Sequence, residues 1–136
     1  MFEHFLRAQK PLYHQVLAEL RAGQKASHWM WFIFPQLRGL GRSPTALRYG
    51  IEGLAMAQDY VRHEVLGPRL VECTAAVLGV RGRTAREIFG SPDDRKFRSS
   101  MTLFSRADPE QAAFADALAQ YYDGIEDPRT VALLGG

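Results

Sequence analysis

Cysteine is almost absent from this sequence of 136 residues, which contains only Cys73. A single thiol excludes an intrachain disulfide framework and any zinc site built from several cysteines. Cys73 shares a helical stripe with Leu70 and Val77, so we expect a small core residue and not a reactive thiol. The histidines include no pair at a spacing of three or four residues, which leaves a histidine-based metal site without support. We therefore predict neither a bound metal nor a cofactor.

The sequence also lacks a long hydrophobic run. The apolar run Trp29–Pro35 is far shorter than the roughly 20 residues needed to cross a bilayer, so we expect no membrane association. The first residues, Met1 to Arg7, have neither the basic region nor the apolar region of a secretory signal. The expected location is therefore the cytoplasm.

Neither sign of charge is in strong excess, since 17 lysines and arginines stand against 15 acidic residues and give a net charge of +2. The basic residues are scattered, so we do not expect nucleic-acid binding. A hydrophobic share of 46% with 24% charged residues is typical of globular proteins and argues against disorder. A chain of this length fits a single globular domain over residues 1–136, which buries about two-thirds of the surface of its unfolded chain.

A second run rich in β-forming residues is missing as well, and this bears on the segment around Trp29. Ser27 can cap a helix that begins at His28, and Pro35 disfavours helical geometry at Phe34, so a helix of about two turns fits. A buried strand fits the length nearly as well. We favour the helix because no partner strand is apparent. In either form the aromatic run is the centre of the core.

Proline placement gives the strongest structural indication in the sequence. A residue with a capping side chain directly precedes proline at four places: Ser43-Pro44, Ser91-Pro92, Asp108-Pro109 and Asp127-Pro128. This arrangement opens helices because the first helical residue needs no amide hydrogen. Thr84 followed by Glu87 adds a capping-box pattern. Together with the helical spacing of apolar residues elsewhere, these features predict an all-α or predominantly α fold of about seven or eight short helices around an aromatic core.

A glycine-containing turn from Arg38 to Pro44 is the most suggestive candidate for a binding site. It runs into a predicted helix start at Ser43 and carries Arg38 and Arg42 on its two sides. Backbone amides and guanidinium groups together make an anion site. The turn lacks the spacing and the lysine of a P-loop. The alternative is a solvated connection between two helices.

The segment from Phe89 to Phe104 is the second candidate. Asp93 and Asp94 fall in the first turn of a predicted helix, where they also complement the helix dipole. Lys96, Ser99 and Ser100 share one face, which could bind a polar ligand or be simply solvated. The G-x-S-x-G elbow of a serine nucleophile is absent.

His28 is the one ionisable group of the aromatic run. An imidazole that faces a cleft can act as a general acid or base, because it titrates near neutrality. The alternative is a structural histidine that donates a hydrogen bond to a carbonyl.

Several sequence runs together resemble a known family. The runs are Lys25–Gln36, which contains His-Trp-Met-Trp-Phe-x-Phe-Pro-Gln, and Val65–Leu70, Ile88–Asp94 and Ser99–Phe104. They resemble a family of small bacterial proteins known as domain of unknown function 1810, some of which carry a calpastatin label. The resemblance covers nearly the whole chain and implies no established reaction. Calpain inhibitors of the calpastatin kind are disordered and polar, whereas this composition requires a packed core.

A weaker resemblance is to small helical N-glycosidases that act on ADP-ribose-like or nucleotide-derived metabolites. Such chemistry needs an acid–base group and electrostatic support for an oxocarbenium-like state. No catalytic motif of such enzymes aligns with this sequence, and the candidates for these roles are His28, Asp93 or Asp94, and Arg42.

Two classes of function follow. The first is a soluble helical domain that binds a small anionic or nucleotide-like ligand, with or without catalysis, in a pocket beside the aromatic run. We expect the ligand to contact Lys25, Trp29, Arg38, Arg42, Lys96 and Ser99, with His28, Asp93 and Asp94 as candidate catalytic residues. The second is a protein–protein interaction module, which predicts a large exposed apolar patch and no polar pocket.

Overall fold

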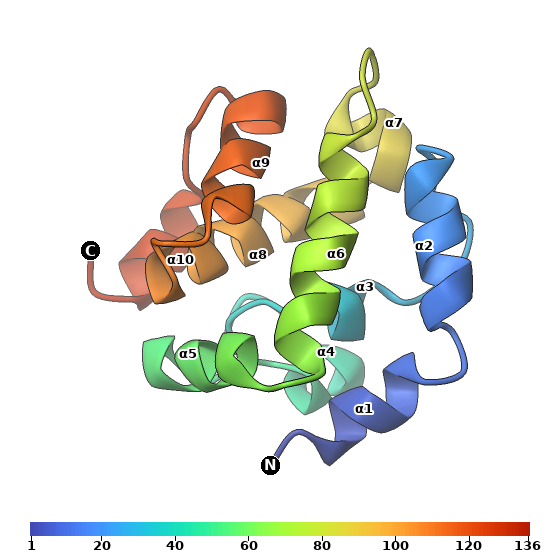
Figure 1. The fold of residues 1–136 in the computed structure, drawn as a ribbon. Helices are drawn as coiled ribbons and strands as arrows, with labels where there is room; N and C mark the ends of the chain where they lie inside the picture. Colours follow the sequence, from blue (N-terminus) through green and yellow to red (C-terminus); the bar gives the residue numbers. More distant parts are fainter.

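The computed structural model describes all 136 residues and contains ten α-helices and no extended strand (Figure 1). The helices are α1 (Glu3–Gln9), α2 (Tyr13–Arg21), α3 (Met30–Ile33), α4 (Pro44–Arg48), α5 (Leu54–Arg62), α6 (Leu66–Leu78), α7 (Ala85–Phe89), α8 (Asp93–Ala107), α9 (Ala112–Tyr122) and α10 (Pro128–Leu133). The predicted all-α fold is confirmed. The helices outnumber the prediction because several are very short, such as α3 with 4 residues and α4 and α7 with 5 each.

Three of the predicted helix starts are present. The Ser43 hydroxyl accepts a hydrogen bond from the Ala46 amide at 3.1 Å, and Asp127 Oδ2 accepts one from the Thr130 amide at 3.0 Å. Thr84 and Glu87 form a complete capping box at the start of α7. Each of these side chains satisfies an amide that has no partner within its own helix.

Two predicted starts are displaced along the chain. α8 begins at Asp93, and neither Ser91 nor Pro92 provides a side-chain cap. α9 begins at Ala112, where the Gln111 side chain accepts a hydrogen bond from the Ala113 amide at 3.3 Å. The Asp108 carbonyl accepts one from the Gln111 amide at 3.1 Å, so Pro109 lies in the turn that follows α8 and not inside α9.

The aromatic run is helical only from Met30 to Ile33, and the predicted start at His28 is wrong. The reason is that the Ser27 side chain does not cap this helix. Its amide and hydroxyl both donate to the Glu19 carboxylate in α2, at 3.1 and 2.7 Å. The segment before Met30 is therefore held in a non-helical conformation by α2.

A core of 30 buried hydrophobic residues unites the helices. α8 packs against α5, α7, α9 and α10, while α6 packs against α2, α5 and α9. Phe34 lies at the centre, with ring centroids 4.9 Å from Phe97 and 6.0 Å from Phe89. The aromatic core predicted from the sequence is confirmed, and Cys73 lies within it.

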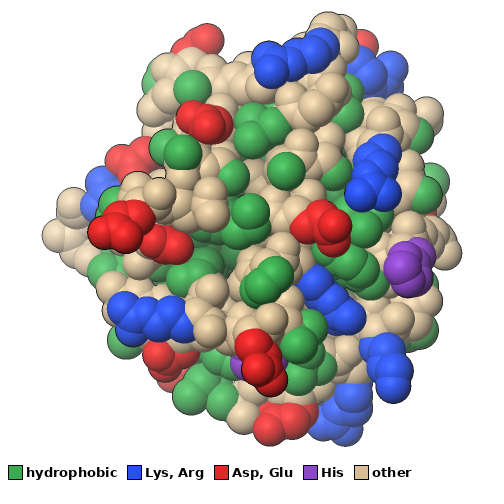
Figure 2. Space-filling view, in the orientation of Figure 1, with side chains coloured by type: hydrophobic (Ala, Val, Ile, Leu, Met, Phe, Trp, Pro, Cys, Tyr) green, Lys and Arg blue, Asp and Glu red, His purple; other side chains and the backbone are tan.

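The surface drawn in Figure 2 mixes hydrophobic and charged side chains. The large hydrophobic side chains that are exposed come from five separate segments: Met1, Leu47, Leu54, Ile125 and Leu133. No helix combines the length and the apolar character that crossing a membrane requires.

Candidate functional site

A pocket of about 420 Å³ opens between the loop after α3, the start of α4, the first half of α8 and the start of α10. Eight of its thirteen lining residues have polar or charged side chains. The lining residues are Trp31, Gln36, Leu40, Gly41, Arg42, Ser43, Ala46, Pro92, Arg95, Lys96, Ser99, Asp127 and Arg129. Three segments that are far apart in the sequence therefore meet at one concave surface.

Positive charge dominates this wall. Four cationic side chains line it, Arg42, Arg95, Lys96 and Arg129, against the single carboxylate of Asp127. Arg42 and Arg95 are exposed and form no hydrogen bond or ion pair with their side chains. Arg129 donates one hydrogen bond, to the Leu40 carbonyl at 3.2 Å. Most of the guanidinium donors of the pocket are thus available to a ligand.

Lys96 connects the pocket to a partly buried charge cluster. Its ammonium group lies 4.3 Å from the centre of the Trp31 ring and 3.5 Å from Asp93 Oδ1. Asp93 Oδ2 contacts the Lys25 ammonium at 2.9 Å, and the Lys25 side chain is only 9% exposed. Asp93 thus balances the charge of Lys25, and Lys25 is separated from the pocket wall by this carboxylate.

The wall formed by residues 36–43 is fixed by a single β-bridge between Leu37 and Ile51. The Arg38 amide donates to the Ile51 carbonyl at 2.8 Å, and the Ile51 amide donates to the Gln36 carbonyl at 3.0 Å. Gly50 permits this approach, because a Cβ atom there would lie 2.8 Å from the Arg38 Cβ. The bridge therefore places Gln36 and the following loop at the mouth of the pocket.

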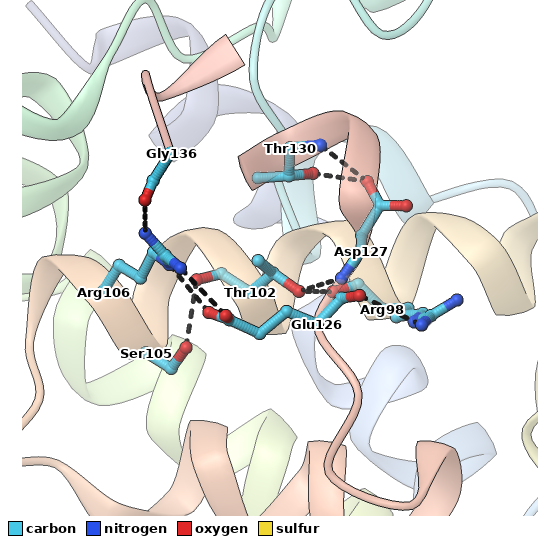
Figure 3. Close-up of polar contacts among 8 residues, drawn as sticks. All are labelled: Arg98, Thr102, Ser105, Arg106, Glu126, Asp127, Thr130 and Gly136. Carbon is cyan, nitrogen blue, oxygen red and sulfur yellow. Dashed lines mark hydrogen bonds and ion pairs between the residues drawn. The ribbon is translucent and has the colours of Figure 1, made fainter. Parts of the chain in front are cut away.

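The opposite wall is positioned by one face of α8, which Figure 3 shows below Asp127 and Thr130. Arg98 donates to the carbonyls of Ile125 and Glu126, at 2.9 and 3.0 Å. Arg106 makes a bidentate contact with the Glu126 carboxylate, at 2.7 and 2.9 Å, and these hydrogen bonds lower the pKa of Glu126. Between them, the Thr102 hydroxyl accepts a hydrogen bond from the Asp127 amide at 2.9 Å. α8 thereby fixes the start of α10 and the Asp127 side chain.

Several of the residues expected from the sequence meet at this site. Arg42, Lys96 and Ser99 line the pocket, although Arg42 and Lys96 come from different parts of the chain. Asp93 and Lys25 adjoin it through Lys96.

The remaining candidates are not among the lining residues, and each has a different environment. Trp29 is fully buried and donates its indole N–H to Glu19 Oε1 at 2.9 Å. Arg38 contacts Glu52 at 2.6 Å and the Leu47 carbonyl at 3.0 Å. His28 is exposed and makes no hydrogen bond with its side chain. Asp94 Oδ1 is buried without a hydrogen-bond partner.

The sequence does not predict four residues of the pocket as ligand contacts: Trp31, Arg95, Asp127 and Arg129. Asp127 was identified from its proline only as a helix cap. Trp31 lies two residues after Trp29, and the sequence could not tell which of the two indoles faces inward. The chain nowhere gathers three or more His, Cys, Asp or Glu side chains in a group that could hold a metal ion.

The fold and the pocket define a small all-α domain with a cationic pocket of ligand size. The chain belongs to the family described as protein of unknown function DUF1810, whose family model matches residues 1–134. It is similar to the conserved hypothetical protein Rv1873 from Mycobacterium tuberculosis, with 58% sequence identity. The crystal structure of that protein has a TM-score of 0.97, over 99% of this chain and 96% of the other. A comparison with curated proteins gives no match.

Proposed function

We propose that the protein binds a small anionic ligand, such as a phosphate ester, in the pocket between α4, α8 and α10. The observation behind the proposal is the meeting of four cationic side chains with one carboxylate. Arginine presents several donors in a planar fork that matches the oxygens of phosphate, and paired contacts of this kind are short and strong. Because Arg42 and Arg95 have no internal partner, a ligand need not displace an existing ion pair to bind them.

The arrangement favours a binding pocket over the other two functions considered. An interaction module predicts a large apolar patch without a polar pocket, whereas this site is concave and is lined by four cationic side chains and one carboxylate. The N-glycosidase hypothesis requires an acid–base group, for which His28, Asp93 and Asp94 are the candidates. None of the three lines the pocket, and Asp93 lies between two ammonium groups.

The proposal is tested by thermal shift and calorimetric titration with inorganic phosphate and pyrophosphate. A ligand present at 100 times its Kd stabilises the folded state by about 2.7 kcal/mol, so binding raises the melting temperature in a concentration-dependent way. We expect this rise in the wild-type protein and a much smaller one in Arg42→Ala and Arg95→Ala.

Arg62→Ala is the matched control, because Arg62 is an exposed arginine on α5 that does not line the pocket. It should respond to phosphate as the wild-type protein does. Equal responses in all four proteins, or none in any, would contradict the proposed site.

A further inference from the structure

We infer that the ligand of this pocket carries hydroxyl groups next to its anionic group, as a phosphorylated sugar or polyol does, and that Asp127 accepts hydrogen bonds from those hydroxyls. The inference rests on the proposed function, because it assigns the uncharged part of the same ligand. It concerns the one feature of the pocket that anion binding does not explain, which is a carboxylate among four cationic side chains.

Asp127 is held firmly through only one of its two carboxylate oxygens. Oδ2 accepts hydrogen bonds from the Thr130 hydroxyl at 2.6 Å, the Thr130 amide at 3.0 Å and the Ser99 hydroxyl at 3.1 Å. Oδ1 accepts no hydrogen bond from the chain, and Asp127 lines the pocket. One oxygen therefore fixes the carboxylate while the other remains able to accept from a ligand.

The backbone of Asp127 is fixed as well. Its amide donates to Thr102 Oγ1, and the carbonyl of the preceding residue, Glu126, accepts from Arg98. Asp127 forms no ion pair with any of the four cationic side chains that share the pocket wall. The Asp127 carboxylate therefore does not neutralise the arginines of the pocket. Its fixed backbone keeps the side chain from turning toward them.

An ionised carboxylate only accepts hydrogen bonds, so its ligand group must be a donor. An ammonium group would be repelled by the surrounding cations, whereas a neutral hydroxyl is not. Trp31 offers an apolar surface to the carbon skeleton, and Gln36 and Ser43 supply further polar groups on the same wall. A phosphate ester with several hydroxyls matches both the cationic part of the pocket and Asp127.

The test compares two phosphate monoesters with the same six-carbon chain. Glucitol 6-phosphate carries hydroxyls along the chain and hexyl phosphate carries none, and inorganic phosphate serves as the third ligand. By isothermal titration of the wild-type protein, we expect glucitol 6-phosphate to bind on the order of tenfold more tightly than hexyl phosphate, the gain of a charge-assisted hydrogen bond.

The informative variant is Asp127→Ser, because serine also caps helices and can accept from the Thr130 amide, but it lacks the charge and the second oxygen. We expect this variant to lose the preference for glucitol 6-phosphate. It should bind inorganic phosphate as tightly as the wild-type protein or more tightly, because a like charge has been removed from the pocket. A purely structural role for Asp127 would weaken all three ligands together.

The outcomes separate the two proposals. If none of the three ligands binds the wild-type protein, the proposed function fails and the inference fails with it. If all three bind but the two esters bind equally well, anion binding stands and the hydroxyl inference is overturned. The same holds if Asp127→Ser keeps the preference. The wild-type comparison decides the matter even if that variant does not fold.

Discussion

At the scale of single residues, Glu19 accepts the largest number of side-chain and loop hydrogen bonds. Its Oε1 accepts from the Ala26 amide at 2.7 Å and the Trp29 indole at 2.9 Å, and both oxygens contact Ser27. Burial alone would raise the pKa of Glu19. The hydrogen bonds from Ala26, Ser27, Gln15 and Trp29 outweigh burial and lower the pKa to about 2.

The pH dependence of stability should therefore depend strongly on Glu19. A depressed pKa in the folded state means that the ionised carboxylate stabilises the fold above the ordinary pKa of 4.5, and that this contribution is lost as the pH falls toward about 2. Glu19→Gln should lower the free energy of unfolding at pH 7 by about 2 kcal/mol, the scale of hydrogen bonds to a charged group. Between pH 5 and about 2, the variant should lose less stability than the wild-type protein. Urea titrations at several pH values measure both effects.

Glu110→Gln serves as the control for Glu19→Gln, because Glu110 is exposed and makes no hydrogen bond with its side chain. It should keep the wild-type stability and its pH profile. A Glu19→Gln protein with an unchanged profile would show that the hydrogen bonds to this carboxylate do not contribute to acid sensitivity.

At the scale of the elements, α8 holds the segment before α10, which includes Asp127, through side-chain hydrogen bonds. Arg98, Thr102 and Arg106 recur every four residues, so they lie on one helix face (Figure 3). Arg98 and Arg106 both bind Glu126, and Thr102 binds the Asp127 amide. Thr102 is fully buried and serves twice, since its hydroxyl donates to the Arg98 carbonyl at 2.8 Å and accepts from the Asp127 amide. The link between α8 and α10 therefore passes through a buried hydroxyl.

Replacing Thr102 by valine should reduce stability by about 1–3 kcal/mol, because the Asp127 amide loses its acceptor in a partly buried place. Thr102→Ser keeps the hydroxyl and removes only a methyl group, so it should cost less, about 1 kcal/mol. Urea denaturation of the two variants gives the comparison. If valine proves as stable as serine, the hydroxyl is not what holds this segment.

The same scale shows how far local sequence patterns determine the helices. Ser43 and Asp127 cap α4 and α10, as the prolines that follow them predict, because each side chain can reach the amide three residues later. Asp108 also directly precedes a proline, but it lies in the turn between α8 and α9 and caps neither helix, because α9 begins only at Ala112. Ser27 illustrates a second limit. Its preference for capping is overridden by Glu19, a partner eight residues away, which no local rule identifies.

At the scale of the whole molecule, the pocket depends on contacts that the sequence does not reveal. The pattern around Arg42 and that around Lys96 each indicated a polar site, but only the packing of the helices brings them together. Arg129 and Asp127 join them because α8 holds the start of α10 in place. Trp29 and Trp31 differ in the same way, since α2 supplies the acceptor that draws the Trp29 indole into the core.

One aromatic cluster links the two halves of the chain, so the molecule should unfold in a single transition. Phe34 is 1% exposed and contacts Phe89 and Phe97, which belong to α7 and α8. Phe34→Ala should remove about 3–5 kcal/mol of stability, the usual cost of deleting a buried aromatic side chain. Tryptophan fluorescence and far-ultraviolet circular dichroism should give coincident urea midpoints for the variant and for the wild-type protein.

Ile125→Ala provides the matched comparison for Phe34→Ala, because the Ile125 side chain is 59% exposed. It should change stability by no more than about 0.5 kcal/mol. Separate midpoints for fluorescence and dichroism in the wild-type protein would show that the helices around the aromatic run and the C-terminal helices fold as independent units. In that case the two walls of the pocket would belong to different folding units, and ligand binding would stabilise the contact between these units. A single shared transition instead means that the pocket is assembled by folding before any ligand arrives.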